Sequence, residues 1–107
     1  MKKKPNLIER ANAGNVKAMY ALGKKIYDEC KSDWHPSEER YRTAFKWLQK
    51  AADGGDYRAY TILGSMYASG NGVEQNLTKA INCFQKAADA GDDHAAFMAE
   101  FIKKQMK

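Results

Sequence analysis

Apolar residues recur at steps of three and four positions along most of the chain, with polar residues between them. The second half shows this in two successive series: Ala59, Ile62, Leu63, Met66 and Tyr67, then Leu77, Ala80, Ile81, Phe84, Ala87 and Ala88. Such steps place side chains on one face of an α-helix, whereas a strand would alternate at every second residue. The pattern predicts an all-α chain in which neighbouring helices pair as hairpins.

Residues that favour the ends of helices stand on either side of these series. Candidate N-caps are Asn15, Asp56 and Asn76. A helix start is predicted at residues 36–39, where two glutamates would lie at the positive end of the helix dipole. Gly55 and Gly91 each follow a predicted helix, as residues in the left-handed conformation commonly do. Residues 70–72, Gly-Asn-Gly, predict the turn inside a hairpin.

A short segment occurs three times, which indicates an internal repeat. Its copies lie at residues 12–18, 53–59 and 89–95. Gly91 in the third copy follows Gly55 in the second by 36 positions, and Gly55 follows Gly14 by 41. The second helices of the two repeats, around Ala44 and Ala80, are 36 positions apart, so five extra residues lie inside the first repeat. We expect them to form a loop over residues 30–36.

The repeat predicts a single domain of stacked hairpins, because one hairpin alone could not bury its apolar face. Small residues inside the helices, Gly23 and Gly64 among them, would let neighbouring helices approach closely. A short first helix is expected near residues 7–13 and a closing helix over 93–105. The predicted organisation is a lead-in at 1–12, a degenerate first repeat at 13–54 with its inserted loop at 30–36, a second repeat at 55–90, and a half repeat or cap at 91–107.

Residues 59–91 carry a pattern of many positions in fixed order. Its members are Ala59, Leu63, Gly64, Tyr67, Gly70, Gly72, Val73, Asn76, Lys79, Ala80, Phe84, Lys86, Ala87, Ala88 and Gly91. The pattern resembles one complete Sel1-like repeat, a relative of the tetratricopeptide repeat. This resemblance implies a right-handed α/α solenoid of two Sel1-like hairpins plus a C-terminal capping helix, and a role as adaptor or scaffold for other proteins. The first copy departs from the family pattern, since it lacks the Gly-x-Gly-Val turn.

Composition and charge narrow the class of protein. Hydrophobic residues make up 44% of the chain and charged residues 29%, as in a globular protein. The net charge of +5 arises mostly at the ends, from Lys2, Lys3, Lys4, Lys103, Lys104 and Lys107. We expect solvated tails there, with weak nucleic-acid binding through the basic termini as an alternative. The chain shows no signal peptide or membrane span, and its two isolated cysteines suit a reducing compartment, so we expect a cytoplasmic protein.

Few residues are candidates for chemistry. Cys30 and His35 lie five positions apart beside Asp33, and a thiol-dependent enzyme activity around them is the alternative to a binding role. A loop cysteine without a group to orient a base is more often incidental, and Cys83 and His94 add no close pair of metal ligands. We therefore expect no catalytic residue, no metal site and no cofactor.

In a stacked solenoid the first helices of successive units line a concave groove, and such surfaces bind other molecules. The repeat register predicts these groove residues: Lys17, Tyr20, Lys24, Tyr27 and Asp28 in the first unit, Arg58, Thr61, Ser65 and Ser69 in the second, and His94, Phe97 and Phe101 in the closing helix. Tyr27 and Phe97 fit the core as well as the groove, because the faces inferred for helices can be off by a residue or two.

The inserted loop is a second candidate surface, with Trp34 and His35 at its centre. Trp34 is either a lid over the gap between helices or an exposed anchor, and the lid is favoured because large aromatic residues are usually buried. The sequence thus predicts a non-catalytic module that binds another protein, as an adaptor or as an inhibitor of the immunity type. Two and a half repeats leave the stack ends uncovered, which would also allow homo-oligomers.

Overall fold

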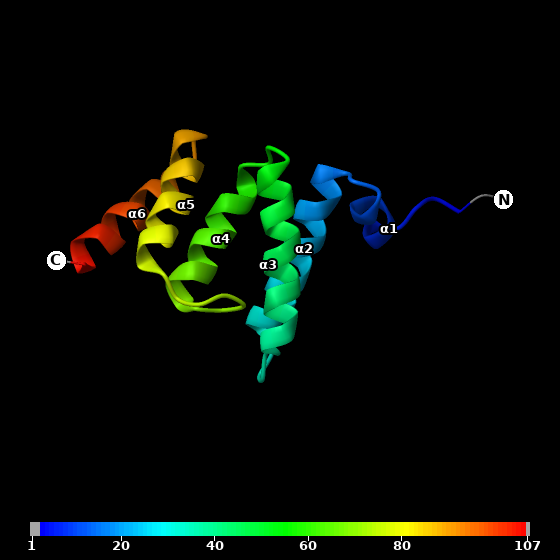
Figure 1. The fold of residues 1–107 in the computed structure, drawn as a ribbon, viewed down its shortest axis with the longest axis horizontal. Coiled ribbons are helices and arrows are strands. Elements are labelled where there is room, and N and C mark those ends of the chain that lie inside the picture. Colours follow the sequence, from blue (N-terminus) through cyan, green and yellow to red (C-terminus); the bar gives the residue numbers. More distant parts are fainter. Residues whose placement is uncertain (1–2, 107) are drawn as a thin grey trace.

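Six α-helices follow one another in the computed structural model, which describes residues 3–106. They are α1 (Leu7–Asn12), α2 (Val16–Ser32), α3 (Glu38–Asp53), α4 (Arg58–Ser69), α5 (Leu77–Asp89) and α6 (Asp93–Gln105). No strand occurs within residues 3–106, so the predicted all-α class is confirmed. Each helix packs against the next, and the stack extends from α1 to α6 along the 60 Å axis of the molecule (Figure 1).

Glycine at one repeat position allows each pair of helices to pack closely. A Cβ atom on Gly23 of α2 would lie 2.7 Å from Cγ of Leu48 in α3. A Cβ atom on Gly64 of α4 would lie 2.9 Å from the ring of Phe84 in α5. Leu48 and Phe84 are fully buried, because each fills the space that the glycine leaves. The same glycine contact therefore allows α2 to pack closely against α3 and α4 against α5.

Side chains cap five of the six helices within residues 3–106, and two of these caps, Asn15 and Asn76, are at predicted residues. Asn15 accepts a hydrogen bond from the backbone N–H of Ala18 at 2.9 Å, and Asn76 accepts one from Lys79 at 3.0 Å. The expectation for Asp56 was wrong, because α4 begins at Arg58 without a side-chain cap. Asp56 instead accepts from the backbone N–H of Arg58 at 3.2 Å, only two residues along the chain.

The extra residues of the first repeat lengthen its helices and not the loop between them. Helix α2 has 17 residues and α4 has 12, while α3 has 16 and α5 has 13. The connection after α2 covers only residues 33–37, so the expectation of a loop over 30–36 was wrong for residues 30–32, which are helical. The long first hairpin therefore projects beyond the rest of the stack, at the bottom of Figure 1.

The turn of the second hairpin contacts the first hairpin (Figure 1). The backbone N–H of Gly72 donates a hydrogen bond to Oε1 of Glu38, in the first turn of α3, at 2.8 Å. Gly72 has φ +74°, and a Cβ atom there would lie 2.6 Å from the carbonyl carbon and oxygen of Tyr41. Only glycine combines this left-handed backbone with so close an approach to another helix. The turn thus links the two repeats.

Replacing Gly72 with alanine tests this link, and Gly14 provides a matched control. Both residues have positive φ, but no atom lies within 4 Å of a Cβ atom built on Gly14. We expect Gly14→Ala to lower the free energy of unfolding by about 1 kcal/mol through backbone strain alone. Gly72→Ala should lower it by about 3 kcal/mol, because a clash with rigid backbone adds to the strain. Urea unfolding followed by circular dichroism measures both, and equal losses would contradict the link.

Candidate functional site

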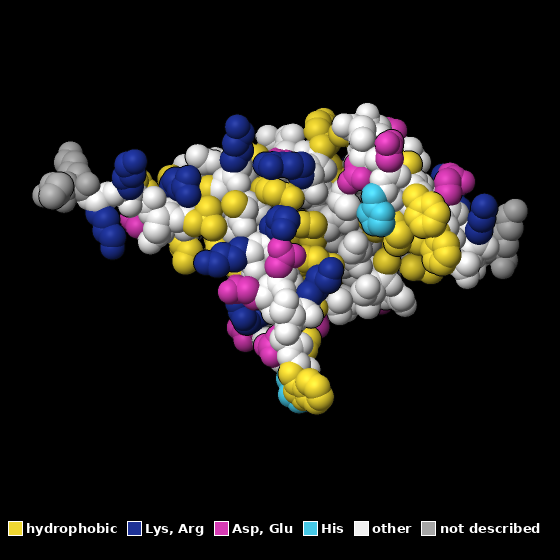
Figure 2. Space-filling model, turned by 180° about the vertical axis from the view of Figure 1, so that it is seen from behind, with side chains coloured by type: hydrophobic (Ala, Val, Ile, Leu, Met, Phe, Trp, Pro, Cys, Tyr) yellow, Lys and Arg dark blue, Asp and Glu magenta, His cyan; other side chains and the backbone are white. Residues whose placement is uncertain are grey.

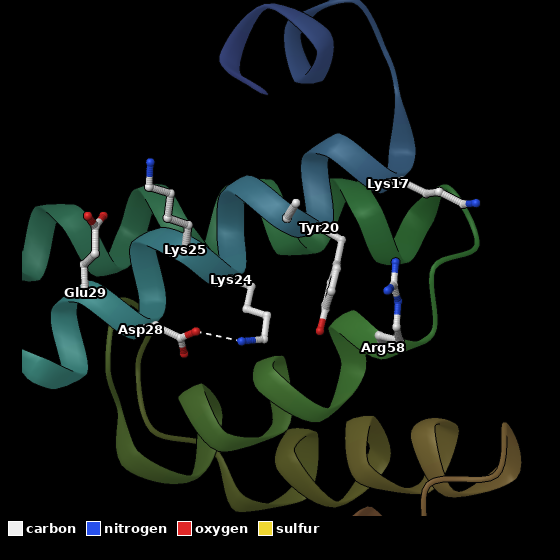
Figure 3. A pocket seen from close by; sticks show the side chains of 8 residues that line it. Lys17, Tyr20, Lys24, Lys25, Asp28, Glu29 and Arg58 are labelled. Carbon is white, nitrogen blue, oxygen red and sulfur yellow. Dashed lines mark hydrogen bonds and ion pairs between the residues drawn. The ribbon is translucent and has the colours of Figure 1, made fainter. Parts of the chain in front are cut away.

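A hollow of about 680 Å³ lies between α2 and the start of α4 (Figure 3). Its lining residues are Lys17, Tyr20, Ala21, Lys24, Lys25, Asp28, Glu29 and Arg58. Five of these, Lys17, Tyr20, Lys24, Asp28 and Arg58, were predicted as groove residues from the sequence. Ala21, Lys25 and Glu29 were missed. These three follow Lys17 at successive steps of four residues. Residues four apart lie on the same face of a helix, so the position of Lys17 in the groove could have indicated them.

Both carboxylates that line this groove, Asp28 and Glu29, form ion pairs within the chain. Lys24 Nζ lies 2.7 Å from Asp28 Oδ2, and Arg40 Nη2 lies 3.0 Å from Glu29 Oε1. The hydrogen bond to Asp28 is the main reason that the pKa of Lys24 is raised, so this lysine keeps its charge. Lys17 and Lys25 form no ion pair with any carboxylate of residues 3–106. The groove is therefore cationic overall.

Arg58 is the most firmly held cation of the groove. Its Nε and Nη2 donate hydrogen bonds to Oδ1 and Oδ2 of Asp56 at 3.0 and 2.7 Å. Its guanidinium carbon lies 4.2 Å from the centre of the Tyr20 ring, which descends from α2 (Figure 3). The hydrogen bond from Arg58 is also the largest cause of the lowered pKa of Asp56. Two neighbours thus fix the guanidinium plane, as in sites that bind planar anions.

Polar contacts on α4 continue the surface toward α6. The Thr61 hydroxyl donates a hydrogen bond to Oδ2 of Asp92 at 2.6 Å, and Asp92 Oδ1 accepts from the backbone N–H of Ala95 at 3.0 Å. The hydrogen bond from Thr61 is the largest cause of the lowered pKa of Asp92. Ser65 donates its hydroxyl hydrogen to the carbonyl oxygen of Thr61 at 3.3 Å, and Ser69 is exposed at the end of α4. Thr61 therefore joins two units.

The predicted groove residues of α6 are all exposed. His94 is exposed, and the exposed fractions of Phe97 and Phe101 are 65% and 49%. The two phenylalanine rings stack with centres 6.3 Å apart. Figure 2 shows hydrophobic side chains gathered beside a histidine toward the C-terminal end, on the face that also carries basic side chains nearer the middle. Phe97 thus belongs to the surface and not to the core.

Tyr27, by contrast, does not belong to the groove. Its exposed fraction is 9%, and its ring packs edge-on against Tyr41 with the centres 6.1 Å apart. Burial is the main reason that its pKa is raised. The structure therefore places Tyr27 in the core, which was one of the two expectations for this residue.

The expectation that Trp34 forms a lid was wrong. Its exposed fraction is 87%, because the lengthened hairpin carries the loop beyond the packed helices. The ring of His35 contacts it edge-on, with the centres 5.7 Å apart. Figure 2 shows hydrophobic and histidine side chains at the tip of the projection. Trp34 is thus an exposed aromatic residue on a hairpin tip.

Cys30 differs from the expected loop cysteine. It lies in the last turns of α2 with an exposed fraction of 1%, and burial raises the pKa of its thiol. A thiol held in its neutral form is a poor nucleophile. Among residues 3–106, no group of three or more His, Cys, Asp or Glu could hold a metal ion. Nor does the described part of the chain contain a helix long and apolar enough to cross a membrane.

The stacked hairpins and the groove along their first helices define an α-solenoid of the class that binds other proteins. The family model of the Sel1 repeat matches residues 16–30, 37–56 and 58–92, and the chain belongs to the Sel1 repeat family. Residues 31–36, in the lengthened hairpin, fall between two of the matched segments. Sel1 repeats are generally non-catalytic protein–protein interaction modules.

Two solved structures share the fold. A Sel1 repeat protein from Oxalobacter formigenes aligns with a TM-score of 0.66 and 33% identity, over 87% of this chain and 66% of that one. The protein c5321, a protective antigen of uropathogenic Escherichia coli strains, aligns with a TM-score of 0.71 and 31% identity, over 83% of this chain and 18% of its own. The predicted solenoid is therefore confirmed.

Two curated relatives are much longer than this chain. DAP3-binding cell death enhancer 1 of Mus musculus is 35% identical over 89 residues, and the protein of the same name in Rattus norvegicus is 34% identical over 89 residues. The match covers 83% of this chain and 16% of each relative. The similarity therefore concerns a repeat segment of those proteins.

Replacing Thr61 with valine tests the contact between α4 and α6. The folded pKa of Asp92 lies below its ordinary value of 3.8, so the stabilisation is fully present above that value and is lost as pH falls through the folded pKa. We expect Thr61→Val to lower the free energy of unfolding by about 1 kcal/mol at pH 7. The difference from the native chain should shrink in acid. Thr43→Val is the control, because Thr43 donates to the neutral carbonyl oxygen of Glu39. A difference independent of pH would contradict the role of Asp92.

Removing the exposed indole tests the position of Trp34. We expect Trp34→Ala to change the free energy of unfolding by less than about 0.5 kcal/mol, as for other exposed side chains. Trp47 of α3 is half-buried against the cluster that contains Leu22, so Trp47→Ala should cost about 2 kcal/mol. Thermal and urea unfolding of both variants check this, and equal losses would show that Trp34 covers the helices after all.

Proposed function

We propose that this chain binds another protein through the surface formed by α2, α4 and α6, and that it acts as an adaptor or as an inhibitor that covers its target. The observation that carries the proposal is the Tyr20–Arg58 pair, held at 4.2 Å in a hollow of about 680 Å³. Tyrosine and arginine are enriched among the residues that dominate binding energy at protein interfaces. Both are oriented before any partner arrives, which lowers the entropy lost on binding.

Further features of the same surface support a protein partner. Phe97 and Phe101 present two stacked rings on α6, and exposed aromatic pairs of this kind mark interaction sites more often than single exposed residues do. The rigid helices around them suit a surface that binds without reorganising. The relative from Mus musculus carries the name DAP3-binding cell death enhancer 1, which describes it by what it binds.

The hairpin tip supports the adaptor role in particular. Trp34 is exposed at the end of the lengthened hairpin, whereas Tyr20 and Arg58 line the hollow between α2 and α4. Two separated surfaces would let one chain contact two proteins at once. The buried Cys30 gives no support to the thiol-dependent alternative, because its pKa is raised by burial. Of the basic termini behind the nucleic-acid alternative, Lys2 and Lys107 lie outside the described residues.

Site-specific photo-crosslinking tests the proposal in host cells. A photoreactive phenylalanine analogue at Tyr20 or Phe97 should form a covalent adduct with one partner protein after irradiation. The same analogue at Lys46, an exposed residue of α3, should form little or none of that adduct. A strong adduct at Lys46 with none at the two surface positions would place the interface on the opposite helices. It would thereby overturn the proposed surface.

A further inference from the structure

Asn71 and Gly72 form the only Asn-Gly pair of the chain. In such a pair the backbone nitrogen of the glycine can attack the side-chain amide of the asparagine before it, because glycine has no side chain to hinder the approach. The pair lies in the turn between α4 and α5, where Gly70 and Gly72 have φ +73° and +74°. A chemically reactive pair therefore stands in the turn that contacts the first repeat.

The electrophile of this pair, the side-chain amide of Asn71, is not restrained by the fold. Asn71 is half-buried, and among residues 3–106 its side chain forms no hydrogen bond. Its backbone is anchored, since its N–H donates to the carbonyl oxygen of Met66 at 3.1 Å. The amide carbon thus belongs to a side chain that no protein hydrogen bond restrains.

The nucleophile, the backbone nitrogen of Gly72, is held in place. Gly72 is buried, and its N–H donates to Oε1 of Glu38 at 2.8 Å. Attack on Asn71 requires this nitrogen to lose its proton and to turn toward the Asn71 side chain, and both require local opening of the turn. The backbone of α3 opposes any shift, because a Cβ atom on Gly72 would lie 2.6 Å from the carbonyl group of Tyr41. The contact between the repeats therefore keeps the pair apart.

We infer that Asn71 is a deamidation site whose reactivity is controlled by the contact of Gly72 with α3. When the turn opens, the Gly72 nitrogen bonds to Cγ of Asn71, its proton passes through water to the side-chain nitrogen, and ammonia leaves. Water then opens the succinimide ring, giving aspartate by attack at Cγ or isoaspartate by attack at the main-chain carbonyl carbon. One water is consumed and one ammonia released, without oxidant or reductant.

Either product weakens the link between the two repeats. Aspartate at position 71 places a negative charge next to Gly72, whose N–H donates to the carboxylate of Glu38, and like charges repel. Isoaspartate adds one carbon to the main chain, where the close approach to Tyr41 leaves no room for it. The reaction therefore makes the contact of the turn with α3 harder to form again.

Incubation of the complete chain in mildly alkaline buffer, followed by peptide mass spectrometry, tests the inference. The method detects replacement of the amide NH₂ by OH at Asn71 and separates the aspartate and isoaspartate products. Conversion in the urea-unfolded chain should be faster than in the folded chain by about tenfold or more, because the contact is absent there. Asn82, followed by Cys83 inside α5, is the internal control and should stay unconverted in the folded chain.

Replacing Glu38 with alanine tests the role of the contact. Glu38→Ala should raise the rate of conversion in the folded chain about tenfold, because it removes the acceptor of a charge-assisted hydrogen bond. Glu39→Ala removes the same charge one residue along, and within residues 3–106 the Glu39 side chain forms no hydrogen bond or ion pair. It should therefore convert at the native rate. Circular dichroism confirms that both variants fold.

The aged chain gives a second measurement that needs no variant of α3. After conversion, the native chain should unfold at a lower urea concentration than the fresh chain, whereas Asn71→Ala, which cannot deamidate at this position, should not change with age. Equal rates of conversion in the folded and unfolded chain overturn the inference, as do equal rates in Glu38→Ala and Glu39→Ala. A chain whose stability is unaffected by conversion, or that never converts even in urea, also overturns it.

Discussion

Close approach of paired helices at one glycine position is the constraint on which the rest of the structure depends. Gly23 and Gly64 have no side chain where Leu48 and Phe84 enter, and both entering side chains are fully buried. A Cβ atom at either glycine would come within 3 Å of the partner side chain, so a larger residue would push the helices apart. Both hairpins use the same repeat position, so one register of contacts pairs α2 with α3 and α4 with α5.

That common register is what gives the surface its chemistry. Residues at equal positions in α2, α4 and α6 fall into rows, so Lys17, Arg58 and His94 continue one another although 77 positions separate the first from the last. The contacts between units then hold the rows together. Gly72 bonds to Glu38 at one end of the stack's helices, and Thr61 bonds to Asp92 at the other. Each is a hydrogen bond to a carboxylate, which is stronger than one between neutral groups.

The proposed binding function therefore depends on shape and charge along one exposed face of the stack. Arg58 is held by Asp56, from the turn before α4, and by Tyr20, from the preceding unit. Its orientation therefore depends on the stacking of the repeats. The thiol of Cys30, which in isolation suggested reactivity, is instead a buried side chain of the first hairpin. Such a division is expected of a repeat protein, in which interior positions maintain the stack and one exposed face is left to bind.

The sequence by itself determined the helices, the repeat offsets and most of the groove on α2. Hydrophobic periodicity, capping residues and glycines act over a few neighbouring residues, so the sequence shows them directly. Five of the eight residues that line the main hollow followed from the alignment of the repeats. Tertiary structure decided the rest. Tyr27 is buried and Phe97 exposed because the rotation of each helix depends on its neighbours, and within residues 3–106 no element packs on the outer face of α6. Trp34 is exposed because the extra residues lengthened two helices and carried the loop away from every surface that a lid could cover.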